Sequence, residues 1–239
     1  MKKILLLLAF FIALCGSFCL THRNNQYSNV TESSAPEEKV YNLESSASYG
    51  FELNDTEEMY KGHEYIAIIH VDKIYPATTY REYTDEYIMP YTPGEATVLK
   101  ALKGQFESEK ISFSRLGGKV SYYEYIKSLY PSEREKFGSF FREEDKESLF
   151  INTKFKDDID IEDDKIYLVY MNRSDDFHKK NEYNIEAFEY GLREANLDTS
   201  KSVLNLSNIT IKNNKTNEYE KIEKAVSSEI AKKISSFCN

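Results

Sequence analysis

The chain has 239 residues, of which 41% are hydrophobic, and a formal net charge of −9. This length and composition admit one large or two small domains with a sizeable hydrophobic core. The acidic balance, without a basic stripe, argues against a nucleic-acid partner, because binding to phosphate backbones needs clustered Lys and Arg.

The N-terminus has the layout of a secretory signal peptide. Lys2 and Lys3 precede an unbroken apolar run over residues 4–14, and the small residues Gly16 and Ser17 follow. The apolar run is too short to span a bilayer comfortably. We therefore predict a signal peptide over residues 1–20 and an exported protein.

Residues 12–16 read Ile-Ala-Leu-Cys-Gly and resemble the acylation motif of bacterial lipoproteins, which makes Cys15 the candidate lipid attachment site. Leu14 departs from that motif, because the position before the cysteine normally carries Gly, Ala or Ser. Simple cleavage nearby and an uncleaved anchor running to Leu20 are the alternatives. With a lipid the protein would be tethered to the extracellular face of the cell membrane, and after simple cleavage it would be secreted.

The other two cysteines, Cys19 and Cys238, lie near the two ends of the chain. A disulfide between them is compatible with the oxidising exterior. Two unpaired terminal thiols are the alternative, and we expect the folded domain to be independent of either outcome.

Residues 21–60 are predicted as a disordered polar tether, because they are rich in Ser, Asn and Glu and lack apolar periodicity. A single folded domain is expected over residues 61–239. Alternating apolar and polar residues, many of them β-branched or aromatic, predict its strands. They are expected at 63–75, 94–104, 109–118, 164–173, 182–191 and 202–213, with 164–173 the most hydrophobic and therefore central.

Two helical segments are expected in this domain. Residues 121–149 contain Pro131 followed by charged helix formers, which predicts a helical insertion of one or two helices. Near the C-terminus an apolar residue recurs every fourth position, which predicts an amphipathic helix over 217–236 docked on the sheet through Ile222, Val226, Ile230 and Ile234. The predicted fold is mainly β, a small and partly open OB-like barrel of five to six strands with these helices.

The segments 94–118, 163–172 and 184–191 resemble a group of uncharacterised secreted or lipid-anchored proteins of Gram-positive bacteria. The resemblance covers roughly residues 63–192, and Asp163-Asp164 stands where that group usually carries a Gly. More faintly, the strand order resembles OB-fold and netrin-like barrels, including metalloprotease-inhibitor domains. Those inhibitors present an N-terminal Cys to a catalytic metal, a mechanism that does not carry over here because the predicted tether separates Cys15 and Cys19 from the barrel.

Six carboxylates lie within residues 157–164. An EF-hand calcium loop starting at Asp158 would need Gly and Glu where the chain has Asp163 and Val169, so the motif is absent. Strand-like alternation instead predicts that Ile159 and Ile161 point inward, that Asp158, Asp160 and Glu162 face water, and that Asp163-Asp164 makes the turn. Weak calcium binding is the alternative, with candidate ligands Asp158, Asp160 and Glu162.

No other metal site, cofactor or catalytic residue is expected. His63 and His70 are seven residues apart on a predicted strand, which sends them to opposite faces. The chain has no G-x-S-x-G motif and no P-loop.

Tyrosine is abundant in residues 75–91, and its large apolar face and polar tip suit a recognition surface. The candidate ligand-binding residues are Tyr80, Tyr83, Tyr87 and Tyr91; packing against the helical cover is the alternative. We predict an exported, non-enzymatic binding module whose partner is a cell-envelope protein or glycan. The alternatives are an extracellular hydrolase acting through a carboxylate pair and an inhibitor of an exported protease with residues 76–93 as bait.

Overall fold

The computed structural model describes residues 38–46, 55–174, 181–188, 190–197 and 206–237. The predicted signal peptide, Cys15, Cys19 and Cys238 lie outside the described residues, as does most of the predicted tether. No helix within the described ranges is long and apolar enough to cross a membrane.

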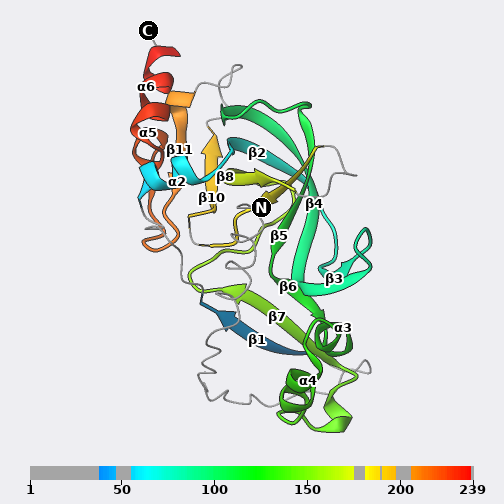
Figure 1. The fold of residues 1–239 in the computed structure, drawn as a ribbon. Helices are drawn as coiled ribbons and strands as arrows, with labels where there is room; N and C mark the ends of the chain where they lie inside the picture. The colour runs from blue at the N-terminus through cyan, green and yellow to red at the C-terminus, as the bar shows by residue number, and fades with distance from the viewer. Residues whose placement is uncertain (1–37, 47–54, 175–180, 189, 198–205, 238–239) are drawn as a thin grey trace.

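Five strands form a closed barrel at the centre of the molecule (Figure 1). In order around the barrel they are β8 (Ile166–Arg173), β2 (Tyr65–Ile74), β4 (Glu86–Lys103), β5 (Lys110–Leu116) and β9 (Glu182–Ile185). All neighbours are antiparallel except β5 and β9, which are parallel, and β9 closes the barrel by also pairing with β8. The prediction of a mainly β barrel with helices is confirmed, although the barrel is closed where we expected it to be partly open, so it fits the OB-like fold only loosely.

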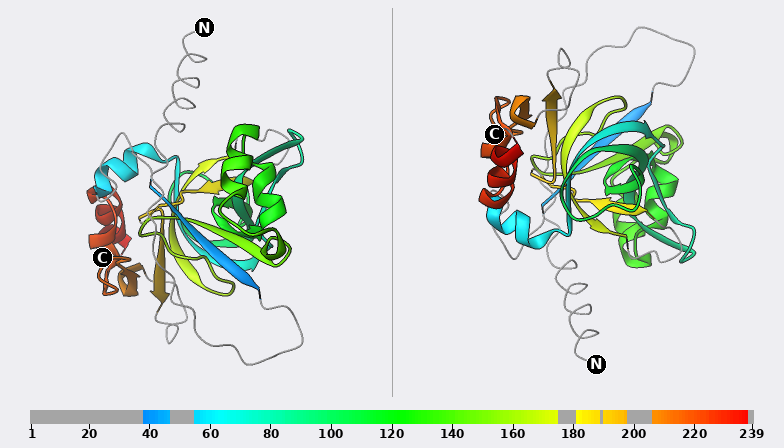
Figure 2. Two further views of the ribbon diagram at one scale, coloured as in Figure 1. Left: turned by 90° about the horizontal axis from the view of Figure 1, so that it is seen from below. Right: turned by 90° about the horizontal axis from the view of Figure 1, so that it is seen from above.

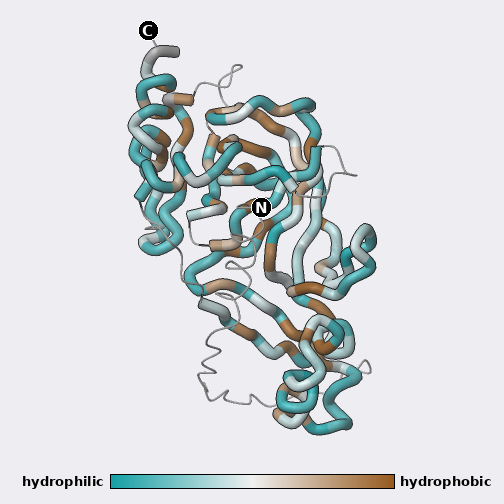
Figure 3. The backbone as a smooth tube through the Cα atoms, viewed as in Figure 1, coloured by the Kyte–Doolittle hydropathy of each residue, from teal (hydrophilic) through white to brown (hydrophobic). Residues whose placement is uncertain are grey.

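Strands β2 and β8 are the most apolar because both of their faces are buried. Ala67, Ile69 and Val169 point into the barrel core, whereas Ile66 and Leu168 point to a second core outside it. Near-continuous apolar runs are typical of such strands. The prediction that 164–173 is a central strand is therefore confirmed. Figure 3 shows the contrast with the hairpin of β3 (Thr78–Arg81) and the start of β4, which is mostly hydrophilic.

The second core lies between the barrel and the C-terminal part of the chain. Three strands extend the sheet from β8: β10 (Leu192–Leu197), β11 (Ile209–Lys212) and β12 (Tyr219–Lys221). The short 3₁₀-helix η2 (Leu206–Asn208) and the helices α2 (Thr56–Gly62), α5 (Ile222–Ala225) and α6 (Ser228–Phe237) complete this side. Figure 2 shows these helices on one side of the barrel and the helices α3 (Tyr122–Lys127) and α4 (Pro131–Gly138) on the other.

The predicted C-terminal helix is confirmed in its apolar face and wrong in its extent. Ile222, Val226, Ile230 and Ile234 are all buried against the barrel. However, Tyr219–Lys221 is a strand, and α5 and α6 are separate helices because Val226 is extended. A four-residue apolar repeat identifies the buried face but not the break within it.

A small second sheet lies beside the helical insertion. Its order is β1 (Lys39–Ser45), β7 (Leu149–Phe155) and β6 (Gly118–Ser121), and β1 pairs with β7 in parallel. It packs with the helices α3 (Tyr122–Lys127) and α4 (Pro131–Gly138) and the 3₁₀-helix η1 (Glu143–Asp145). Their shared core is rich in aromatic rings, including Tyr122, Tyr125, Phe137 and Phe141. The helical insertion at 121–149 is thus found where it was expected.

The prediction of a disordered tether over 21–60 is wrong for two stretches, since Lys39–Ser45 is β1 and Thr56–Gly62 is α2. Strand β1 is held by backbone hydrogen bonds to β7 and buries only Leu43, so it lacks the apolar alternation that reveals a strand. Helix α2 buries only Met59 and begins at Asp55, whose carboxylate accepts hydrogen bonds from two backbone N–H groups.

Candidate functional site

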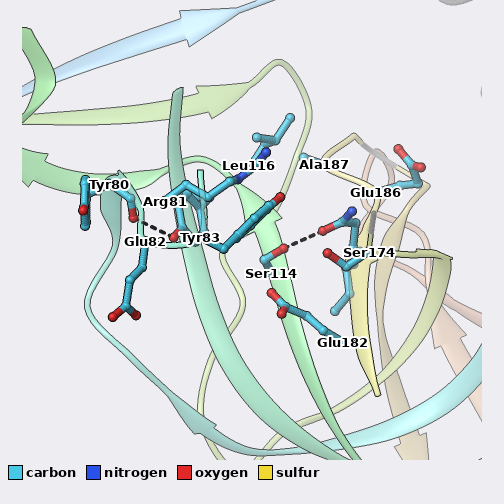
Figure 4. Close-up of a pocket in the computed structure, with 13 residues that line it drawn as sticks. Tyr80, Arg81, Glu82, Tyr83, Ser114, Leu116, Ser174, Glu182, Glu186 and Ala187 are labelled. Atoms are coloured by element: carbon cyan, nitrogen blue, oxygen red, sulfur yellow. Dashed lines mark hydrogen bonds between the residues drawn. The ribbon is translucent and has the colours of Figure 1, made fainter. Parts of the chain in front are cut away.

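A cleft of about 760 Å³ lies between the β3–β4 hairpin and the strands β5 and β9 (Figure 4). It is on the outer surface of the barrel, because Ser114 and Leu116 line it while the alternating Phe113 and Arg115 point inward. The lining combines tyrosines, charged groups and small polar side chains: Tyr80, Tyr83, Tyr91, Arg81, Glu82, Glu182, Glu186, Ser114, Ser174 and Asn184, with Leu116, Ile185 and Ala187.

The hairpin reaches this position because β4 pairs with different partners along its 18 residues. Its first part pairs with β3, and its second part, from Gly94 onward, pairs with β2. A Cβ on Gly94 would lie 2.3 Å from the ring of Phe113 and 2.7 Å from the carbonyl oxygen of Lys73. Gly94 therefore permits the close approach of the strands at the base of the hairpin.

The turn of the hairpin carries Glu82 and Tyr83 into the lining. Asp85 has a positive φ of 54°, and its backbone N–H donates to the carbonyl of Glu82 at 3.3 Å. Aspartate tolerates this left-handed conformation better than most residues, which suits it to a turn. Tyr80 donates through its hydroxyl to the Asp85 carboxylate at 2.8 Å, and this hydrogen bond raises the pKa of Tyr80.

Three of the four predicted tyrosines come together in the cleft. Tyr80, Tyr83 and Tyr91 line it, and the hydroxyl of Tyr91 donates to the backbone carbonyl of Tyr80 at 2.9 Å. Tyr87 does not line the cleft but packs beside it, with its ring 5.3 Å from that of Tyr80 and the ammonium of Lys127 5.3 Å from its ring. Tyr80, Tyr83 and Tyr87 are 38%, 42% and 43% exposed, so these rings are not core residues.

Polar side chains from β5 and β9 meet at the opposite wall. The parallel register places Ser114 beside Asn184, and the Ser114 hydroxyl donates to Oδ1 of Asn184 at 2.6 Å. On the hairpin side, the guanidinium of Arg81 lies over the ring of Tyr83 at 5.4 Å from its centroid. The hairpin wall therefore carries Arg81 and Glu82, and the facing wall combines small polar groups with Glu182 and Glu186.

Glu186, at the rim of the cleft, is linked to the start of the barrel. Its Oε1 accepts a hydrogen bond from Nδ2 of Asn172 at 3.0 Å and lies 3.4 Å from Nε2 of His63. Asn172 in turn accepts from the backbone N–H of Glu64 at 3.1 Å. This network holds the rim against the junction of α2 and β2.

The acidic segment forms a cap on the barrel core rather than a calcium loop. Ile159 and Ile161 pack against the barrel core, as predicted. The prediction that Asp158 faces water is wrong: it is buried and paired with Arg115, and burial raises the pKa of its carboxyl. Asp158 points inward because it pairs with the buried guanidinium of Arg115 on β5. The local alternation cannot reveal this partner, which is 43 residues away in the sequence.

The three candidate calcium ligands have separate partners. Asp158 pairs with Arg115, Asp160 lies 3.2 Å from the ammonium of Lys154, and Glu162 lies 3.0 Å from that of Lys165. In the described part of the chain, no three His, Cys, Asp or Glu side chains are grouped so that they could hold a metal ion.

The two histidines do not share a strand, contrary to the prediction. His63 ends α2, is buried, and its Nδ1 lies 2.7 Å from the carbonyl of Met59. His70 is in β2, half-buried between the carboxylates of Asp72 and Asp164 at 3.1 and 3.0 Å.

Sequence reasoning missed Arg81 and the residues of the β5–β9 wall. Ser114 and Asn184 are 70 residues apart, and their parallel pairing leaves no local signal. The alternation in residues 110–116 does indicate that Ser114 and Leu116 share the outer face, which was the available clue.

No family model, curated protein or solved structure matches this chain.

Proposed function

We propose that this chain is an exported, lipid-anchored and non-enzymatic binding module that holds a cell-envelope glycan in the cleft between the β3–β4 hairpin and the β5–β9 wall. Export and the lipid at Cys15 are inferred from the N-terminal sequence. The observation that carries the ligand class is the convergence of Tyr80, Tyr83 and Tyr91 with small polar and charged side chains in one cleft.

A sugar ring matches this lining in shape and in chemistry. It has an apolar face that packs on an aromatic ring and a rim of hydroxyls that need both donors and acceptors. Tyr83 provides an exposed ring, and Ser114 and Asn184 provide hydrogen-bonding groups on the facing wall. The volume of about 760 Å³ is within the usual range for ligand pockets. OB-like barrels are known to bind oligosaccharides on their strands and loops, and this barrel is loosely of that kind.

Binding of fractionated envelope glycans to the immobilised chain, residues 21–239, tests the proposal. Tyr83→Ala should weaken binding roughly tenfold, because stacking on an aromatic ring contributes about 1 kcal/mol or more. Its melting temperature should stay close to that of the wild type, because the Tyr83 ring is exposed. Tyr130→Ala, which alters an exposed ring on the helical side, is the matched control and should bind normally. Unchanged binding by Tyr83→Ala would refute the proposed site.

A hydrolase is the second candidate, because Glu82, Glu182 and Glu186 line the same cleft. Glycoside hydrolysis requires two carboxyls on opposite sides of the scissile bond. The same binding assay separates the two functions when the glycan is recovered afterwards. A binding module returns it intact, whereas a hydrolase releases new reducing ends.

A further inference from the structure

The charged side chains that line the cleft are mostly acidic. They are Glu82, Glu182 and Glu186 against the single guanidinium of Arg81, and no Lys or His is among the described residues of the lining. Even if Arg81 neutralised one carboxylate, the other two would remain in excess. The lining therefore has a negative balance, as does the whole chain with its net charge of −9.

The positive and negative groups occupy different parts of the cleft. The guanidinium of Arg81 lies over the ring of Tyr83, at 5.4 Å from its centroid. In the view of Figure 4, Arg81 extends toward Leu116, whereas Glu82 and Glu182 extend to the opposite side. A cationic group of a ligand can therefore approach these two carboxylates without meeting Arg81.

The carboxylates differ in how they are engaged by the rest of the protein. Glu186 accepts from Asn172 and lies beside His63. Glu82 is exposed, and its carboxylate takes part in none of the ion pairs or hydrogen bonds of the described chain. Oε2 of Glu182 is buried and accepts no hydrogen bond from the described residues. The acceptors of the cleft therefore match a ligand that brings donors of its own.

An ammonium group is the ligand chemistry that suits these carboxylates best. It has three N–H donors and no acceptor, and its hydrogen bonds to carboxylates are stronger than those between neutral groups. A carboxylate that is shielded from water is stabilised by a cationic partner, because burial of an unpaired charge is costly. The hydroxyls of a neutral sugar can donate to the same oxygens, but they leave the excess negative charge uncompensated.

We propose that the glycan bound in the cleft carries free amino groups, as in an amino sugar without an N-acetyl group, and that Glu82 and Glu182 accept hydrogen bonds from its ammonium groups. This inference rests on the proposed function and specifies its ligand. The exposed ring of Tyr83 contacts the apolar face of the sugar. The negative field of the whole chain attracts a cationic glycan, and the two carboxylates decide where its amines dock.

Titration with D-glucosamine, N-acetyl-D-glucosamine and D-glucose, followed by NMR chemical shifts of residues 21–239, tests the assignment. At about pH 6 the amine of glucosamine is protonated and the carboxylates are ionised. Glucosamine should then bind roughly tenfold more tightly than the other two sugars, because only its hydrogen bonds to the carboxylates are charge-assisted at both ends.

Replacing both carboxylates, Glu82→Gln together with Glu182→Gln, should remove this preference while the neutral sugars still bind. Glu135→Gln is the matched control, since it removes an exposed carboxylate on α4 that does not line the cleft, and it should keep the preference. Added NaCl should lower the preference in the wild type, because salt screens the attraction between the amine and the carboxylates.

The outcomes separate this inference from the proposed function. Equal affinity for glucosamine and the two neutral sugars, or an unchanged preference in the double variant, overturns the amino-sugar ligand and leaves glycan binding in place. Absence of shifts with all three sugars refutes both. Should the double variant fail to fold, Glu82→Gln alone alters an exposed side chain and should reduce the preference for glucosamine; an unchanged preference there also overturns the inference.

Discussion

The two ends of the barrel sheet use tyrosine in opposite ways. On the C-terminal side, Tyr170 is buried beneath the helical cover, and burial raises its pKa to about 12. On the hairpin side, Tyr80 and Tyr83 are exposed and line a cleft. The difference shows that burial by neighbouring elements, rather than residue type, decides whether a tyrosine stabilises the fold or is available to a ligand. The buried and the exposed tyrosines lie in different parts of the molecule. Substitutions on the C-terminal side should therefore change the stability of the fold, whereas substitutions in the cleft should leave it nearly unchanged.

The largest effect is expected from the buried arginine of the C-terminal side. Arg193 is 2% exposed and donates to the carbonyl of Lys212 at 3.0 Å and to the carboxylate of Glu220 at 2.6 Å. Arg193→Met should lower the free energy of unfolding by about 3 kcal/mol, because it leaves buried acceptors without a donor. Urea denaturation measures the change.

Arg173→Met is the control for that substitution. Its ion pair with Glu107 is solvent-exposed, so the loss should be under about 1 kcal/mol. Similar losses in the two variants would show that the C-terminal side is not more dependent on its polar contacts than the surface.

An effect that is somewhat smaller for each ionising group is expected at alkaline pH. Burial raises the pKa of Tyr125 and of Tyr170 to about 12, from an ordinary value of 10. A group whose pKa is raised by folding contributes stability that is complete below its unfolded pKa and is lost as the pH rises through the folded value. The stability of the protein should therefore fall between pH 10 and pH 12, by about 2 to 3 kcal/mol for each of the two groups.

Urea midpoints together with tyrosinate absorbance would follow this loss. Tyr170→Phe should make the pH dependence shallower, because it removes one of the two ionising groups. A pH dependence identical to that of the wild type would contradict the burial of this hydroxyl.

The smallest effect is expected on the hairpin. Tyr87→Ala removes a ring contact with Tyr80 and the cation–π contact with Lys127, both at 5.3 Å. Because Tyr87 is 43% exposed, the loss of unfolding free energy should stay below about 1 kcal/mol. A loss as large as that of Arg193→Met would mean that the hairpin is part of the folding core, and the contrast between the two sides would fail.

Much of the barrel is predictable because its strands bury side chains with a regular period. The strand at 110–116 follows from alternation, the strands at 65–74 and 166–173 follow from their apolar, β-branched and aromatic composition, and the buried face of the C-terminal helices follows from the four-residue repeat. Strand β10 was missed because Arg193, which is buried in it, reads as a surface residue until its partners Lys212 and Glu220 are known. Strand β1 was missed because it is held in place mainly by backbone pairing with β7. Its single buried side chain, Leu43, leaves no apolar alternation in the sequence.

The cleft is only half predictable. Its hairpin wall follows from a tyrosine-rich segment, since Tyr80, Tyr83 and Tyr91 are close in the sequence. Its other wall depends on the parallel pairing of β5 with β9, and pairing between distant strands has no local sequence signal. The ion pair between Arg115 and Asp158 also has no local sequence signal, because the two residues meet only in the folded barrel.

The parallel pairing of β5 with β9 also has a consequence for biogenesis. Ser112 is paired with Glu182, so the ring of strands cannot close until the segment after residue 182 has been synthesised. Until then the antiparallel meander of β2, β4 and β5 presents an unprotected edge, which invites association with other nascent chains. A product truncated ahead of β9 would lack one of the two walls of the cleft, and it should therefore fail to bind the proposed glycan even if the remaining strands were to fold.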